Sequence, residues 1–396
     1  MTVATRRKLA ALVLGGGVAL AALSCGAGGA GVDYGYFDKT SRPSSGAALR
    51  VRWTKPLAPE FSGAYVPVEH AAAALDPRHE RLYVGSSQRT LWAFDTGGRA
   101  LWTYQAESSI EAEPTLDPMR DELYVATAAG HVHALSAYDG KKRFDVNLEV
   151  AISQPGILSD DALYLVTDSD AVFALSRKDG SVLWRYQRDP RTGLKITGHA
   201  GLLSADQRLI TGFSDGSIVA LAKGDGRALW VVDTTLDLTD TAQADIGFVD
   251  VDTTPVLVGD TVYAASFLAG VYALRVQDGV TLTRHAELGG ITSLAGDERT
   301  ITMVSAEHGV VCYDLPALTV RWTRNQHIRG AANYVKLRDR TLFVTESRGA
   351  LLAIAVADGR ELGRLQTTHG FAAEPTISEG RGAILGNSGV VYAFDY

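Results

Sequence analysis

Three neighbouring runs of sequence decide the fold: Leu82-Tyr-Val-Gly-Ser86, Thr90-Leu-Trp-Ala-Phe-Asp95 and Ala100-Leu-Trp-Thr-Tyr104. Each run is short, rich in β-branched and aromatic residues, and bounded by Gly, Asp or Ser, which is the pattern of consecutive β-strands. The same phrase occurs eight times along the chain, with one small residue at a fixed place in its middle run. Those eight residues are Ala93, Ala134, Ala174, Ala220, Ala273, Cys312, Ala353 and Ala393.

The spacing of the phrase indicates a ring of repeated units. Successive small residues are 41, 40, 46, 53, 39, 41 and 40 residues apart, and a period near 40–45 residues is typical of a β-propeller. A stretch of smaller apolar residues precedes each phrase, as at Glu113-Pro-Thr-Leu116, and we predict that it forms the innermost strand. Each repeat is then a four-stranded antiparallel blade. Asp-Gly turns join its last two strands at Gly140, Gly180, Gly226, Gly279 and Gly359.

Aromatic residues recur at one place in the predicted outer strand. Trp102, Trp184 and Trp230 each follow a turn glycine by four residues, and Phe144 and Trp322 hold the equivalent place in two other repeats. The regular period favours packing between blades over an aromatic platform for a ligand.

The two ends of the repeat array complete each other. The eighth repeat stops at Val390-Val-Tyr-Ala-Phe-Asp-Tyr396, where the others turn into an outer strand, and Leu49-Arg-Val-Arg-Trp-Thr54 supplies a run of that kind. We predict that this N-terminal strand pairs with the C-terminal blade and removes an exposed edge. The sequence therefore predicts an all-β fold, an eight-bladed propeller over residues 49–396.

Residues 1–24 have the character of an export signal: Arg6-Arg7-Lys8, then a 15-residue apolar run to Leu23. The following Ala22-Leu23-Ser24-Cys25-Gly26 resembles a bacterial lipobox, although the motif in its strict form places leucine where Ala22 stands. We expect Cys25 to carry the lipid, with cleavage nearby or an uncleaved anchor as alternatives. Thr5–Leu9 loosely resembles a twin-arginine signal as well. Residues 25–48 are rich in Gly, Ala and Ser and are expected to form a flexible tether.

Charge and cysteine content narrow the partners. The chain has 38 Lys and Arg against 45 Asp and Glu, and residues 1–24 contain three of the basic residues, so the remainder carries 35 − 45 = −10. An acidic body argues against nucleic acid or an anionic lipid surface as a partner. Cys312 stands where seven repeats have alanine, so we expect a small buried core residue there.

No catalytic or cofactor site is predicted. His131 and His133 alternate along a strand and would face the same side, as two metal ligands do, but no third ligand stands at a useful spacing. We found no nucleophile turn, phosphate loop or dinucleotide fingerprint in the sequence. The sequence therefore predicts no catalytic residue, no metal ligand set and no cofactor.

The blade phrase resembles the repeats of pyrroloquinoline-quinone dehydrogenases. Those enzymes carry a vicinal disulfide over the cofactor, and this chain has no Cys-Cys pair. The resemblance therefore implies the repeat and not the chemistry.

Two neighbouring repeats are longer than the rest. The additional residues fall at 188–199 and 234–249, after the outer strands of the third and fourth blades. In an antiparallel blade both connections leave from the same face, so we expect a binding surface there. Tolerated drift of loop length is the alternative.

The second long connection ends in Asp250-Val-Asp-Thr-Thr-Pro-Val256. An acidic-Val-acidic-Thr-Thr-Pro-Val run in this blade resembles the BamB family, lipoproteins of the outer-membrane β-barrel assembly machinery. The resemblance implies that Asp250 and Asp252 contact the partner BamA.

An apolar-x-apolar-Arg motif in the preceding connection completes the contact in that family. Leu194 and Ile196 match its apolar pair, Thr197 stands in place of the arginine, and Arg191 and Lys195 lie nearby. The structural alternative for the two aspartates is that their carboxylates accept hydrogen bonds from backbone amides of a turn.

The resemblance implies a non-catalytic scaffold on the periplasmic side of the outer membrane. It would be anchored through an N-acyl lipid on Cys25, would bind a BamA-like protein and nascent barrel proteins, and would be a monomer within the complex. A quinone-binding or redox-active propeller, or a ligand-sensing or adhesion propeller, are the alternatives.

Overall fold

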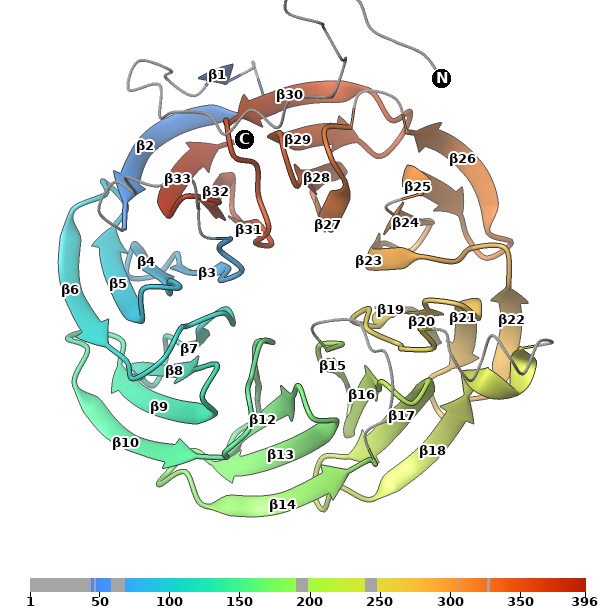
Figure 1. Ribbon diagram of the computed structural model, residues 1–396, viewed down its shortest axis with the longest axis horizontal. Coiled ribbons are helices and arrows are strands. Elements are labelled where there is room, and N and C mark those ends of the chain that lie inside the picture. The colour runs from blue at the N-terminus through green and yellow to red at the C-terminus, as the bar shows by residue number, and fades with distance from the viewer. Residues whose placement is uncertain are drawn as a thin grey trace, which may run out of the picture. The chain divides into compact units, whose positions relative to one another are not determined.

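The computed structural model describes residues 44–45, 48–57, 68–189, 199–238, 248–305, 307–325 and 328–396. The chain divides into a unit Met1–Asp38 and a unit Lys39–Tyr396, and every described residue lies in the second. Eight antiparallel sheets are arranged as blades around a common centre (Figure 1). The predicted eight-bladed propeller is confirmed.

We number the blades in chain order, and each contributes strands from the centre outward. Blades 1 to 4 contain, in turn, β3 Ala73–Asp76, β4 Arg81–Val84, β5 Thr90–Asp95 and β6 Ala100–Gln105; β7 Thr115–Asp117, β8 Glu122–Ala126, β9 His131–Ser136 and β10 Lys142–Asn147; β11 Ile157–Leu158, β12 Ala162–Thr167, β13 Ala171–Ser176 and β14 Val182–Gln187; and β15 Leu203–Ala205, β16 Arg208–Gly212, β17 Ser217–Ala222 and β18 Ala228–Asp233.

Blades 5 to 8 follow the same plan, with two strands from the N-terminal end added at the rim. They contain β19 Val256–Val258, β20 Thr261–Ser266, β21 Gly270–Arg275 and β22 Thr281–His285; β23 Ile291–Gly296, β24 Thr300–Ser305, β25 Gly309–Asp314 and β26 Thr319–Arg324; β27 Ala332–Arg338, β28 Thr341–Glu346, β29 Ala350–Ala355, β30 Glu361–Gln366 and β1 Ser44–Ser45; and β31 Thr376–Ser378, β32 Arg381–Gly386, β33 Val390–Asp395 and β2 Arg50–Pro56. A single turn of 3-10 helix, η1 Thr234–Asp237, follows β18.

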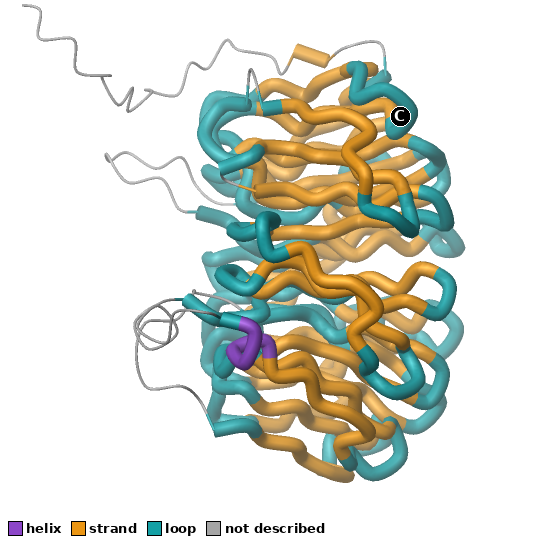
Figure 2. Tube along the Cα trace, turned by 90° about the vertical axis from the view of Figure 1, so that its right-hand side faces the viewer, coloured by secondary structure: helices purple, strands orange, loops and turns teal. Residues whose placement is uncertain are grey.

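The strands run across the thickness of the ring, between two faces formed by loops (Figure 2). Gln105, at the end of β6, pairs with Thr90, at the start of β5. The connection from an outer strand to the next inner strand therefore leaves from the same face as the turn between the second and third strands. We call this side of the ring the connection face.

Ring closure follows the prediction. β2 pairs antiparallel with β33, and Trp53 lies opposite Ala393. Blade 7 differs from a four-stranded blade because β1 adds to its rim, with Ser44 opposite Gln366. That strand lies in a Gly, Ala and Ser-rich segment without the alternation that would reveal it.

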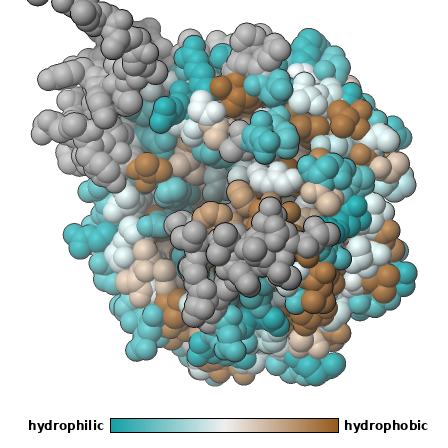
Figure 3. Space-filling model, turned by 45° about the vertical axis from the view of Figure 1, so that its right-hand side comes forward, coloured by the Kyte–Doolittle hydropathy of each residue, from teal (hydrophilic) through white to brown (hydrophobic). Residues whose placement is uncertain are grey.

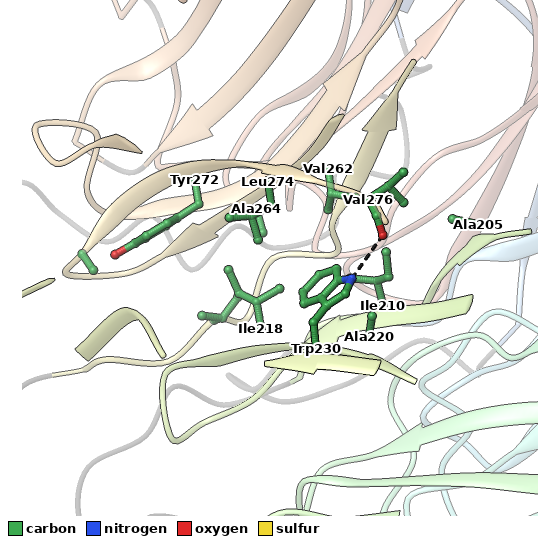
Figure 4. Close-up of a cluster of buried hydrophobic side chains, with 12 residues drawn as sticks. Ala205, Ile210, Ile218, Ala220, Trp230, Val262, Ala264, Tyr272, Leu274 and Val276 are labelled. Carbon is green, nitrogen blue, oxygen red and sulfur yellow. Dashed lines mark hydrogen bonds between the residues drawn. The ribbon is translucent and has the colours of Figure 1, made fainter. Parts of the chain in front are cut away.

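The hydrophobic core consists of clusters, one at each seam between adjacent blades. Figure 4 shows the seam between blades 4 and 5, where Trp230 from β18 packs among aliphatic side chains of both blades. Its Nε1 donates a hydrogen bond of 3.1 Å to the carbonyl oxygen of Val276. Cys312 is fully buried in the seam between blades 6 and 7, as expected.

Aromatic residues of the outer strands lie over turn glycines of the next blade. A Cβ atom added at any of these glycines would come within 2.4–2.7 Å of the ring, and the five indoles each donate a hydrogen bond of 2.8–3.1 Å to a backbone carbonyl of that blade. The predicted packing between blades is confirmed. The pairs are Trp53 with Gly98, Trp102 with Gly140, Phe144 with Gly180, Trp184 with Gly226, Trp230 with Gly279 and Trp322 with Gly359.

Two seams lack this pair, and in both the aromatic residue and the glycine are absent together. Blade 5 has the exposed Thr283 at the aromatic position, and the turn that follows in blade 6 is Leu315–Leu318, without glycine. Blade 7 has Gly363, where the backbone nitrogen of Leu49 would lie 3.2 Å from an added Cβ. The aromatic residue and the glycine therefore form one structural unit.

Candidate binding site

The predicted partner-binding residues fall in two places. Leu194, Ile196 and Thr197 lie outside the described residues, as does the predicted lipidation site, Cys25. Asp250 and Asp252 are described, in the segment that leads into β19. The site is therefore built from this segment and its neighbours.

Backbone hydrogen bonds fix the segment between blades 4 and 5. The amide of Val251 donates to the carbonyl oxygen of Phe213 in blade 4 at 3.1 Å, and the amide of Phe267 in blade 5 donates to the carbonyl oxygen of Asp250 at 2.9 Å. The hydroxyl of Thr253 accepts a hydrogen bond of 3.1 Å from the amide of Ala265. The segment is therefore held from both sides.

The two aspartates differ in exposure. Asp250 is 4% exposed, whereas Asp252 is partly exposed and lines a cavity at the centre of the ring. Neither residue belongs to a strand, since β19 begins at Val256. Both residues precede that strand, and Asp252 is the one of the two that lines the cavity.

Burial governs the protonation of Asp252. Burial raises the pKa of this carboxyl most, the backbone amide of Asp252 and the charge of His199 lower it, and the charge of Asp250 raises it, so that the pKa is about 7. Oδ1 of Asp252 is buried and accepts no hydrogen bond from the described part of the chain. A donor or a cation that entered the cavity would find the partly exposed Asp252 in its wall.

His199 lies at the edge of the same cavity and is held by a buried network. Its Nε2 lies 3.2 Å from Oδ1 of Asp170, and its Nδ1 lies 2.9 Å from the carbonyl oxygen of Ala200. Asp170 also accepts hydrogen bonds from the amide and the hydroxyl of Ser214. Burial raises the pKa of Asp170, but the hydrogen bonds from His199 and Ser214 outweigh it and leave that pKa lowered. The network fixes the imidazole beside Asp252.

The cavity has a volume of about 520 Å³, and its wall combines apolar side chains with several ionisable ones. Nζ of Lys336 lies 2.9 Å from Oε1 of Glu374. Burial raises the pKa of Glu113 to about 7; the charge of Lys336 lowers it and that of Glu374 raises it. For Lys336, burial lowers the pKa, but the charges of Glu374 and Glu113 outweigh it and raise it. The cavity wall contains the carboxyl groups of Asp252, Glu113 and Glu374 and the ammonium group of Lys336, a balance that suits a cationic guest better than an anionic one. The other polar lining residues are His70, Gln154, His199, Thr254, Thr292, Ser293, Asn333 and Tyr334.

Sequence reasoning did not find Glu113, Lys336 and Glu374. A signal for two of them was present, because Glu113 and Glu374 each precede the proline that leads into an inner strand, as Gln154 and Thr254 do. Residues at this place in the repeat converge on the centre of the ring. Lys336 lies within β27 and carries no comparable mark.

The outer surface is mixed in polarity. Figure 3 shows apolar and polar side chains interspersed over the visible face, and exposed apolar side chains such as Leu183 and Val320 belong to outer strands of different blades. Among the described residues, no helix has the length and apolar character needed to cross a membrane.

Comparison with known proteins gives a consistent family. Residues 112–324 match a family model described as outer membrane protein assembly factor BamB. The curated protein of that name from Escherichia coli K12 is 26% identical over 321 residues, which cover 68% of this chain and 81% of that protein. The one from Yersinia pestis is 25% identical over 274 residues, covering 69% and 68% of the two chains.

Solved structures agree on the fold. The crystal structure of BamB from Moraxella catarrhalis superposes with a TM-score of 0.75 at 21% identity, covering 88% of this chain and all of that one. Quinohemoprotein alcohol dehydrogenase from Comamonas testosteroni superposes with a TM-score of 0.68 at 14% identity, covering 88% and 76% of the two chains. The second likeness is one of fold alone.

Proposed function

The chain belongs to the BamB family of outer membrane protein assembly factors, and we propose that it is a non-catalytic scaffold which binds a BamA-like assembly protein through its connection face. The proposal includes a lipid anchor on Cys25 that holds the propeller on the periplasmic side of the outer membrane. It also includes nascent barrel proteins as transient clients.

The observation that carries the partner assignment is the environment of Asp252. Asp252 is partly exposed and lines a cavity whose wall contains two further carboxyl groups, and its buried Oδ1 accepts no hydrogen bond from the described residues. A lysine or arginine side chain of a partner would supply donors and a compensating charge. Desolvated charge pairs of this kind contribute to the affinity of an interface far more than pairs at its rim.

The second half of the proposed contact lies on the neighbouring connection. Leu194 and Ile196 belong to the segment between β14 of blade 3 and β15 of blade 4, and the Asp250 segment connects β18 of blade 4 to β19 of blade 5. Both connections begin where an outer strand ends, on the connection face. We infer that the two apolar side chains anchor the partner while Asp252 orients it, with Thr197 leaving the cationic role to other residues.

Co-purification from detergent-solubilised envelope tests the proposal. The double variant Asp250→Asn with Asp252→Asn keeps the shape of both side chains and removes their charge, and Leu194→Asp places a charge in the apolar anchor. We expect both variants to lose the partner, since removing one member of a desolvated charge pair costs about 2–5 kcal/mol of binding free energy.

A matched control uses the same two blades on the opposite face. Asp225 and Asp278 lie in the turns between the third and fourth strands of blades 4 and 5, so Asp225→Asn with Asp278→Asn should retain the partner. Full retention in the Asp250 and Asp252 variant and in the Leu194 variant, with unchanged circular dichroism, would contradict the assignment of the connection face.

A further inference from the structure

The seam between blades 1 and 2 contains two histidines, and one of them occupies a place that is hydrophobic in the other repeats. His133 lies one residue before the fixed small residue of its repeat, Ala134. The residues at that position in the other repeats are Trp92, Phe173, Val219, Tyr272, Val311, Leu352 and Tyr392. A polar ring at a position that is otherwise hydrophobic requires a local reason.

A third polar side chain meets the two histidines from the neighbouring blade. Glu107 follows β6 of blade 1, and one ligand-type atom from each of Glu107, His131 and His133 lies within 4.8 Å of the others. Oε2 of Glu107 is 2.7 Å from Nε2 of His133, and the two imidazole rings are stacked with centroids 5.7 Å apart. The sequence did not reveal this group because its third member comes from another blade.

Further partners hold these three side chains in place. The hydroxyl of Tyr104 lies 3.2 Å from Nδ1 of His133, and the hydroxyl of Thr127 donates to Oε1 of Glu107 at 2.6 Å. Oδ2 of Asp145 lies 3.5 Å from Nδ1 of His131. Contacts at the far nitrogen of each ring are the arrangement that orients metal-binding histidines, because they fix which nitrogen remains available for the metal.

We propose that Glu107, His131 and His133 form a binding site for a divalent metal ion that joins blade 1 to blade 2. Two imidazole nitrogens and one carboxylate oxygen suit zinc, whereas magnesium and calcium prefer oxygen ligands alone. Ligand atoms in a tetrahedral zinc site with bonds of about 2.0–2.2 Å lie about 3.3 Å apart. Small side-chain rotations would bring the three atoms to that spacing, and a water molecule would complete the coordination.

The alternative is that these residues form only a hydrogen-bond network. Such a network accounts for His133, which has partners at both ring nitrogens, but among the described residues it offers Nδ1 of His131 only the 3.5 Å contact with Oδ2 of Asp145. Nδ1 of His131 is buried without a hydrogen bond in the described part of the chain, and its backbone amide is bonded to the hydroxyl of Thr127. Nζ of Lys142 donates a hydrogen bond of 2.9 Å to Oδ1 of Asp145, whereas Oδ2 of Asp145 is the oxygen near His131. His131 therefore adds a third ligand-type side chain to the pair of Glu107 and His133, and a zinc site with a bound water needs three such ligands.

Calorimetric titration of the untagged full-length protein with zinc chloride tests the site. We expect one tight equivalent of zinc per chain. His131→Gln and Glu107→Gln, which replace partly exposed side chains, should each weaken binding at least about tenfold, and Tyr104→Phe should weaken it by about tenfold through loss of orientation. Cobalt chloride should give visible d–d absorption of a low-coordinate site in the parent protein, and neither of the two ligand variants should show it.

His285→Gln is the matched control. His285 is paired with the carboxylate of Glu287 at 2.9 Å, and among the described residues it belongs to no group of three metal-ligating side chains. The control should bind zinc as the parent does, and zinc should raise the melting temperature of the parent but not of His131→Gln. Zinc affinity that is unchanged in both His131→Gln and Glu107→Gln would overturn the proposal, as would equal competition by magnesium.

Discussion

The indole ring of Trp53 lies over Gly98, so that a Cβ atom at Gly98 would be 2.7 Å from Cδ2 of the ring. Trp53 belongs to β2, the outer strand of blade 8, and Gly98 belongs to the turn between β5 and β6 of blade 1. Nε1 of Trp53 also donates a hydrogen bond of 2.9 Å to the carbonyl oxygen of Thr96. The same contact of an aromatic ring with a turn glycine joins successive blades elsewhere in the ring, and here it joins the last blade to the first.

The first prediction concerns this closing contact. Trp53→Ala should lower the free energy of unfolding by about 2–4 kcal/mol, because it removes a half-buried ring and leaves a cavity over Gly98. Urea denaturation measures the change. Thr283→Ala is the control, because Thr283 holds the same place in blade 5 and is exposed; its effect should stay within about 0.5 kcal/mol. Equal effects of the two substitutions would show that the contact contributes nothing to closure.

The second prediction separates backbone strain from collision in the turn glycines. Gly226 has φ of +71°, and an added Cβ would lie 2.4 Å from the ring of Trp184, so Gly226→Ala should cost about 2–4 kcal/mol. Gly259 has φ of +57° with open space around it, so Gly259→Ala should cost about 1 kcal/mol. Gly224 has open space and no such φ, and Gly224→Ala should be neutral. Any other order of the three unfolding free energies would argue against collision with the indole.

The third prediction is a pH dependence of stability. The pKa of Asp252 is raised in the folded protein, from 3.8 to about 7. A group with a raised folded pKa contributes stability that is full below the unfolded pKa and is lost as pH rises through the folded one. The parent should therefore lose stability between about pH 4 and pH 7 through this group, by at most about 4 kcal/mol.

Asp252→Asn removes this titration. The stability of the variant relative to the parent should rise from pH 5 to pH 8, as measured by urea denaturation at both values. Glu298→Gln, at an exposed position, is the control and should show no such trend. If the free energies of unfolding of Asp252→Asn and the parent differ by the same amount at both pH values, the pKa of Asp252 is not raised in the folded protein.

The fourth prediction concerns the proposed anchor. Cys25→Ala should turn a protein that sediments with outer membranes into a soluble one, because a soluble propeller is then left without its acyl chains. Fractionation of cell envelopes with immunodetection measures the change. The parent protein sets the reference. Continued sedimentation of the variant would assign membrane association to protein contacts instead.

The repeat made the fold predictable, whereas the site was predictable only in part. Blade number, closure by Trp53 and the packing of Trp184 all follow from positions that recur at a regular interval, so each prediction was supported by several repeats. Lys336 and Glu107 occur once, and their neighbours come from other blades. Nothing in a single sequence states which unique side chains meet across a ring.

The pairing of β2 with β33 has a consequence for how the protein is made. In a chain synthesised from its N-terminus, β2 follows only β1 among the described strands, whereas its partner β33 is the last strand to appear. Closure across such a sequence separation is slow, and until it happens β2 and the rim of blade 8 both present open hydrogen-bonding edges. Until the ring closes, the newly made chain therefore presents two strand edges that are available for pairing with other chains.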